Sequence, residues 1–119
     1  MILDCTLRDG GYYTHWEFDN DLVQEMVSVL SKSKVDYIEL GYKSPLPGGR
    51  FRKCNDNFIS QLLKNVSYDS RLAFMIDAKD FIEDNKVNKR LLLDVIKPKD
   101  KSPFSLCRIA TNYESLDLA

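Results

Sequence analysis

The sequence lacks long hydrophobic runs, an excess of either charge and any targeting segment. No apolar run approaches the roughly 18 residues that a membrane-spanning helix needs, and no signal peptide follows Met1. The 17 basic and 18 acidic residues nearly cancel, whereas nucleic-acid-binding proteins concentrate basic residues on one face. These absences predict a cytoplasmic protein that binds neither nucleic acid nor membrane.

Cysteine and histidine are too few for a disulfide framework or a zinc site. Cys5, Cys54 and Cys107 are odd in number, far apart and free of any C-x-x-C spacing. We expect them to be reduced thiols that pack as small hydrophobic side chains. The one histidine is His15.

Four short apolar segments have the character of strands. We expect these strands over residues 1–7, 35–41, 71–77 and 105–111. Helices are expected over about 20–30, with an apolar stripe of Leu22, Val23, Met26, Val27 and Leu30, over about 58–66, and from 112 onward. Residues 80–97 fit a short helix or an irregular connection. This alternation predicts an α/β fold of parallel β/α units.

The chain ends soon after the fourth predicted strand, which leaves two kinds of fold. A flavodoxin-type sheet could end there, although Asp9 in its first turn would repel a phosphate. A (β/α)8 barrel cut at its midpoint also fits, because a full barrel has about 250 residues. We predict the N-terminal half of such a TIM barrel, covering residues 1–119 and truncated after its fourth strand.

Polar side chains are predicted to meet at one end of this sheet. Alternation places Thr6 and Arg8 on one face of the first strand, and Glu39 and Gly41 on the same face of the second. Neighbouring parallel strands lie about 5 Å apart. We therefore expect Arg8, Asp9 and Glu39 to converge at the carboxyl ends, where α/β folds place active sites.

Three more polar residues follow the later strands. Asp77 and Arg108 should face inward from the third and fourth strands, and Tyr42 should lie at the rim. Each is predicted to contact substrate. The alternative is that these polar side chains only fill the interior of the barrel and bind no ligand.

These residue types suit the chemistry of an enolate. Asp9 offers a hard oxygen ligand for Mg²⁺ or Mn²⁺. Arg8 could clamp a carboxylate or stabilise an enolate oxygen, and Glu39 could hold the guanidinium or transfer a proton. From spacing alone, a buried ion-pair network without catalytic function, or a helix-capping Asp9, is an equal alternative.

Three segments resemble the HMG-CoA lyase-like aldolases, or DRE-TIM metallolyases. They are TLRDGG at 6–11, IELGY at 38–42 and CRIAT at 107–111. The family's Asp, Arg and Glu match Asp9, Arg8 and Glu39, and 4-hydroxy-2-oxovalerate aldolase is one member. The resemblance implies a TIM barrel in which Asp9 and other ligands hold Mn²⁺ or Mg²⁺, which chelates a 2-oxo acid or acyl thioester while a carbon–carbon bond is cleaved or formed.

The sequence departs from this family in two places. The family's metal site includes an H-x-H pair, which is absent here, so the missing ligands would come from further sequence. Tyr12 stands where the oxovalerate aldolases have a histidine base, although tyrosine, with an ordinary pKa of about 10, is a poor base at neutral pH. His15 could substitute as the base, or be a solvated loop residue.

The loop after the second strand is the other candidate for substrate contact. Its PLPGGRFRK segment carries Arg50, Arg52 and Lys53 without a phosphate-binding P-loop pattern. It could be a mobile basic flap over an anionic substrate, or an ordinary charged surface loop.

The sequence therefore predicts part of a metal-dependent aldolase or lyase that acts through the enolate of pyruvate or another 2-oxo acid. The predicted catalytic residues are Arg8, Glu39 and Tyr12, the metal ligand is Asp9, and Arg8, Tyr42, Asp77 and Arg108 bind substrate. We expect the 119-residue chain to be inactive alone, with an incomplete metal site, and to form a homo-oligomer through its open sheet edges. The alternative is a non-catalytic domain that binds a small acid or supports assembly.

Overall fold

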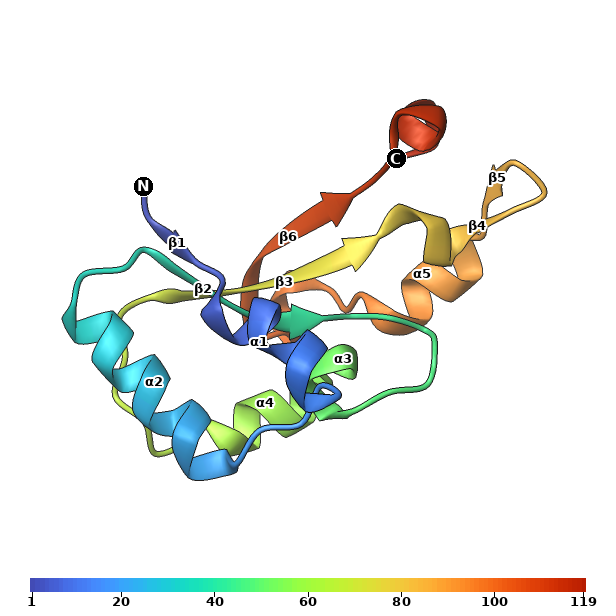
Figure 1. The fold of residues 1–119 in the computed structure, drawn as a ribbon. Coiled ribbons are helices and arrows are strands. Elements are labelled where there is room, and N and C mark those ends of the chain that lie inside the picture. The colour runs from blue at the N-terminus through green and yellow to red at the C-terminus, as the bar shows by residue number, and fades with distance from the viewer.

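Four parallel strands form the centre of the computed structural model, which describes residues 1–119 (Figure 1). Their order is β1-β2-β3-β6, and every neighbouring pair is parallel. The bounds are Leu3–Asp4 for β1, Tyr37–Tyr42 for β2, Arg71–Asp77 for β3 and Phe104–Ala110 for β6. The predicted α/β fold with a parallel sheet is therefore confirmed.

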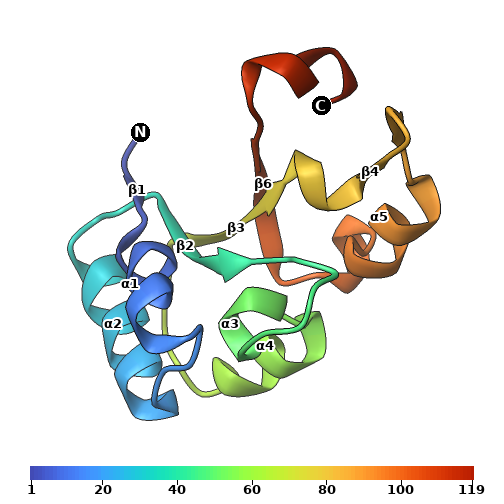
Figure 2. The ribbon, with the colours of Figure 1, turned by 45° about the vertical axis from the view of Figure 1, so that its right-hand side comes forward.

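Helices gather on one side of this sheet (Figures 1 and 2). The helices are α1 (Thr6–Thr14), α2 (Asn20–Lys32), α3 (Arg50–Lys53), α4 (Asp56–Leu62) and α5 (Lys89–Val95). Their apolar residues and those of the sheet form one core, which includes Val23, Val27, Ile59 and Leu62 from helices and Ile38, Leu40, Leu72 and Phe74 from strands. No helix is both long and apolar enough to cross a membrane.

The first strand is much shorter than predicted, and a helix replaces its second half. The Asp4 carboxylate accepts hydrogen bonds from the backbone N–H and the hydroxyl of Thr6, both at 3.0 Å. Such a local bond turns the chain out of the extended conformation, and α1 begins at Thr6. The predicted strand alternation of Thr6 and Arg8 was therefore wrong, because both residues are helical.

Several smaller predictions also differ from the structure. Leu22 was assigned to the buried stripe of α2, but it lies on the exposed side of that helix. The loop after β2 contains the short helix α3, which is anchored by fully buried Phe51.

Residues 80–97 form part of a 3-10 turn (Ala78–Phe81), the small β4–β5 hairpin (Ile82–Glu83 and Lys86–Val87) and α5. Asn112 caps the final 3-10 segment, Tyr113–Leu118, by accepting from the N–H of Ser115.

A bulge in β2 changes the face of the sheet toward which its last side chains point. Glu39 pairs with Ala73, but Tyr42 pairs with Met75, so β2 has one residue more than β3 over this stretch. Such a bulge moves later side chains to the opposite face. Tyr42 therefore lies on the same face as Glu39, and the predicted inward direction of Gly41 was wrong. A Cβ on Gly41 would meet the Phe51 carbonyl oxygen of α3 at 2.0 Å.

Candidate active site

The fully buried carboxylate of Glu39 lies at the centre of the candidate site and binds two arginines. It accepts a hydrogen bond from Arg8 Nε at 2.9 Å, and from Arg108 Nε and Nη2 at 2.6 and 2.8 Å. On its other side, Arg8 Nη1 lies 2.7 Å from the Asp9 carboxylate. The structure thus brings Arg8, Asp9 and Glu39 together, as the sequence predicted.

Three elements that are distant in sequence position these side chains. Arg8 comes from the first turn of α1, Glu39 from β2 and Arg108 from β6. The strand β3 lies between β2 and β6 and places Ala73 beside Glu39. Because alanine is small, the longer Arg108 side chain reaches across β3 to the carboxylate.

The charges of this cluster balance, and Glu39 is ionised within it. Burial opposes ionisation of Glu39, but the hydrogen bonds from Arg108 and Arg8 outweigh that effect and lower its pKa below the ordinary value. Arg108 Nη1 makes no hydrogen bond or ion pair with the protein, and Arg8 Nη2 makes none with an oxygen atom. These N–H groups are therefore the donors that an anionic ligand would meet.

Cys5, which we expected to pack as a small hydrophobic side chain, also contacts the cluster. Arg108 Nη2 lies 3.6 Å from its sulfur. Burial and then the charge of Glu39 raise the pKa of the Cys5 thiol. Burial likewise raises the pKa of Cys54, and that of Cys107 to about 11, so these thiols are protonated at neutral pH.

Two tyrosines lie next to the arginines. Tyr12 follows Arg8 by one turn of α1, and its hydroxyl is hydrogen-bonded to that of Tyr42 at 3.0 Å. Trp16 packs edge-on against both rings, with centroid distances of 4.9 and 5.2 Å. Burial, and then the bond to Tyr12, raise the pKa of Tyr42, so its hydroxyl stays protonated at neutral pH.

A hollow of about 350 Å³ opens beside this aromatic group. Its lining includes Tyr12, Tyr42, Arg52 and Asp77, which the sequence nominated separately. A volume of this size suits a small-molecule ligand. Asp77 accepts from the N–H of Lys79 at 3.2 Å and pairs with its amine at 3.1 Å.

The residues of this chain do not form a complete metal site. No group of three or more histidine, cysteine or acidic side chains is arranged to hold an ion. Asp9 is largely exposed and offers one carboxylate beside Arg8. His15 is exposed at the end of α1, in a left-handed conformation with φ of 54°.

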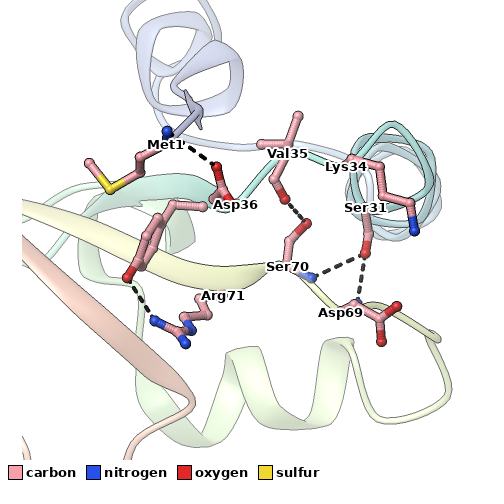
Figure 3. Close-up of a pocket in the computed structure, with 9 residues that line it drawn as sticks. Met1, Ser31, Lys34, Val35, Asp36, Asp69, Ser70 and Arg71 are labelled. Atoms are coloured by element: carbon pink, nitrogen blue, oxygen red, sulfur yellow. Dashed lines mark hydrogen bonds and ion pairs between the residues drawn. The ribbon is translucent and has the colours of Figure 1, made fainter.

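A second hollow, of about 530 Å³, lies at the opposite ends of β2 and β3 (Figure 3). Several of its polar groups, on Ser31, Asp36, Ser70 and Arg71, are bound to other protein groups. The Ser31 hydroxyl accepts from the N–H groups of Asp69 and Ser70, and the Ser70 hydroxyl donates to the Val35 carbonyl. The two serine hydroxyls of this hollow are therefore already engaged by the protein.

Comparison with known proteins found a similar solved structure. The chain is similar to a solved structure described as the "N-terminal domain of a putative aldolase from Bacteroides vulgatus", with 32% identity and a TM-score of 0.74. The match covers 98% of this chain and 37% of that chain. No family model matches the sequence. No curated protein matches it either.

This similarity extends over almost the whole chain, in fold and in sequence. It is consistent with an aldolase-like protein of the α/β class. The chain spans little more than a third of the neighbour's length.

Proposed function

We propose that this chain is the N-terminal part of an aldolase or lyase whose full form is a TIM barrel of the HMG-CoA lyase-like family. The substrate is pyruvate or another 2-oxo acid, and the reaction forms or breaks a carbon–carbon bond next to the carbonyl. The observation that carries this proposal is the buried Glu39 carboxylate, which holds two guanidinium groups with donors left for a ligand. The 32% identity with an aldolase domain supports the reaction class.

Arg8 stabilises the negative charge that develops on the carbonyl oxygen when the enolate forms. Its Nε is bound to Glu39 and its Nη1 to Asp9, so its direction is set before substrate arrives. A preorganised donor of this kind stabilises the charge of the transition state, and removal of such a donor costs about 3–4 kcal/mol in measured cases. Arg108 completes the clamp by binding the substrate carboxylate.

Glu39 acts as a positioning residue in this mechanism. Its carboxylate accepts three hydrogen bonds from arginines, and they lower its pKa, so it is a weak base. The Tyr12–Tyr42 pair supplies a hydrogen-bond donor to the substrate, and the base that accepts the proton from the methyl carbon would come from the rest of the complete gene product. Protonated Tyr42 can donate to Tyr12, which leaves the Tyr12 hydroxyl hydrogen for a substrate oxygen.

A divalent ion, Mn²⁺ or Mg²⁺, is part of the proposal for the complete gene product only. Asp9 would supply one oxygen ligand and hold the ion near the substrate carbonyl. One exposed carboxylate does not form a metal site, so the remaining ligands would come from the rest of the complete gene product. The cytoplasmic location also stays a prediction.

The test is exchange of the pyruvate methyl protons with deuterated water, followed by NMR in the complete gene product with Mn²⁺. Arg8→Ala should slow exchange by about 100- to 1,000-fold, the usual cost of an oxyanion donor. Arg71→Ala, at the opposite end of β3, is the matched control and should leave the rate unchanged. If wild-type protein exchanges protons no faster than Mn²⁺ alone, the aldolase proposal fails. Pyruvate binding without exchange would then favour the small-acid-binding alternative.

A further inference from the structure

Three cationic residues on α3 were candidates for contact with an anionic substrate, and two of them are already bound. Arg50 donates to the Glu17 carboxylate at 2.6 Å, to the side-chain oxygen of Asn20 and to the Phe18 carbonyl. The Lys53 amine donates to the Ser44 carbonyl at 3.2 Å.

Arg52 differs from both, because its side chain makes no hydrogen bond or ion pair. It is nonetheless half-buried, and it lines the hollow beside Tyr12 and Tyr42.

The position of the Arg52 side chain depends on the two glycines before it. A Cβ on Gly48 would lie 2.3 Å from Arg52 Cδ, so the stem of Arg52 packs directly against Gly48. A Cβ on Gly49 would lie 2.4 Å from the Trp16 carbonyl oxygen. The loop therefore packs tightly on the end of α1 and brings Arg52 to the aromatic group.

None of the acidic side chains that line this hollow forms an ion pair with Arg52. The Lys79 amine pairs with Asp77, and Asp80 accepts from the Ser44 hydroxyl at 2.9 Å. Neither carboxylate lies within ion-pair distance of Arg52. A guanidinium in this state is a ready partner for an oxyanion, because its planar N–H groups match a carboxylate or phosphate. Asp80 weakens this attraction, since its negative charge faces the same space.

We propose that Arg52 binds a second oxyanion of the substrate, a carboxylate or phosphate group remote from the carbon that reacts at Arg8. This inference rests on the proposed function and deepens it, since it names a substrate with two anionic ends. Tyr12 lies one helical turn from Arg8, a separation of about 5–6 Å, and it lines the hollow that Arg52 shares. A substrate that extends from Arg8 past Tyr12 would therefore reach the hollow that Arg52 lines.

Trp16, the only tryptophan of this chain, lines the hollow and gives the readout. Its fluorescence is titrated with two matched pairs of ligands. The first pair is 2-oxoglutarate and 2-oxopentanoate, which differ by a distal carboxylate. The second is glycerol 3-phosphate and glycerol, which differ by a phosphate. We expect at least tenfold tighter binding of the more anionic member in one pair, and that pair identifies the oxyanion.

Substitutions then assign this preference to Arg52. Arg52→Gln should abolish it, and Arg52→Lys should retain part of it, because a lysine keeps the charge but not the bidentate geometry. Lys53→Gln removes the neighbouring charge and should leave the preference intact. Asp80→Asn should strengthen binding of the anionic ligand, since it removes a repulsive charge.

Three results would overturn the inference: no preference in either pair, a full preference in Arg52→Gln, or no binding of any ligand. The proposed function fails by a different measurement. If the preference for the anionic ligand depends on Arg52 but proton exchange does not depend on Arg8, the oxyanion site is supported and the aldolase proposal fails. Arg8-dependent exchange without the preference rejects the oxyanion site alone.

Discussion

At the scale of single residues, the site depends on how Glu39 holds two arginines. A buried carboxylate is costly unless it is paired and hydrogen-bonded, and Arg8 and Arg108 satisfy it with three bonds. The same bonds fix the direction of Arg8. The stability and the function of the site therefore share one interaction.

The lowered pKa of Glu39 predicts how this interaction depends on pH. The stabilisation is fully present above the unfolded-state pKa of about 4.3, and it is lost as the pH falls through the lower folded-state value. Glu39→Gln should reduce the free energy of unfolding at neutral pH by about 2–3 kcal/mol, since hydrogen bonds to charged groups are lost.

Urea denaturation of the two proteins at several pH values measures this effect. The difference between wild type and Glu39→Gln should shrink as the pH falls below about 4, because Glu39 of the unfolded chain takes up a proton before that of the folded protein does. A difference that stays constant down to about pH 2 would show that Glu39 is not ionised in the folded protein.

Asp9 leads to a prediction about metal. It is an exposed carboxylate without neighbouring ligands, so the 119-residue chain should bind Mn²⁺ weakly. Calorimetric titration should show no saturable site in the sub-micromolar range. A stoichiometric, tight site would mean that other residues of this chain complete the ligand set.

At the scale of elements, α1 carries Arg8, Asp9 and Tyr12 of the site and contains two adjacent glycines with different surroundings. A Cβ on Gly10 would lie 3.5 Å from the Phe18 ring, an ordinary contact. A Cβ on Gly11 would lie 2.1 Å from the Trp16 ring. Gly11 therefore lets Trp16 pack between the helix and Tyr42.

These two glycines form a matched pair of variants. Gly10→Ala should stabilise the protein by up to about 1 kcal/mol, because alanine favours the helix. Gly11→Ala should destabilise it by about 1–3 kcal/mol through overpacking against Trp16. Thermal unfolding followed by circular dichroism measures both. Equal effects of the two substitutions would contradict the described position of Trp16.

The elements also show why sequence reasoning succeeded in the middle of the sheet and failed at its start. The strand at 71–77 was predicted correctly, because an apolar segment between a polar loop and Asp77 has few alternatives. The segment 1–7 was misassigned because a local bond from Asp4 to Thr6 overrides its apolar character.

The candidate site was found only in part for similar reasons. Motif residues such as Arg8 and Glu39 were identified and do converge. The bulge that turns Tyr42 toward these residues depends on the pairing of β2 with β3. The proposed role of Arg52 depends on the observation that Arg50 and Lys53 already have partners. A sequence pattern contains neither kind of information.

At the scale of the whole molecule, the sheet is open. The edges are β1, which has only two residues, and β6, which has unpaired backbone groups along one side. Apolar side chains near β6 are exposed, including Ile109 and Leu116. Open edges of this kind promote pairing with another chain.

We therefore expect the 119-residue chain to self-associate, with a dimer as the simplest closed form. Sedimentation velocity at micromolar concentration should show a species of about twice the mass of 13.8 kDa. Lys or Glu in place of Ile109 should shift the equilibrium toward monomer. A single monomeric species in the wild type would contradict this expectation.

The central claim is that Glu39 serves the reaction by holding Arg8, and a double-mutant cycle tests it most directly. Pyruvate proton exchange is measured in the complete gene product for wild type, Arg8→Ala, Glu39→Gln and the double variant. If Glu39 acts through Arg8, the double variant should be no slower than Arg8→Ala alone. If instead the two losses multiply, Glu39 acts independently of Arg8, and the account is wrong.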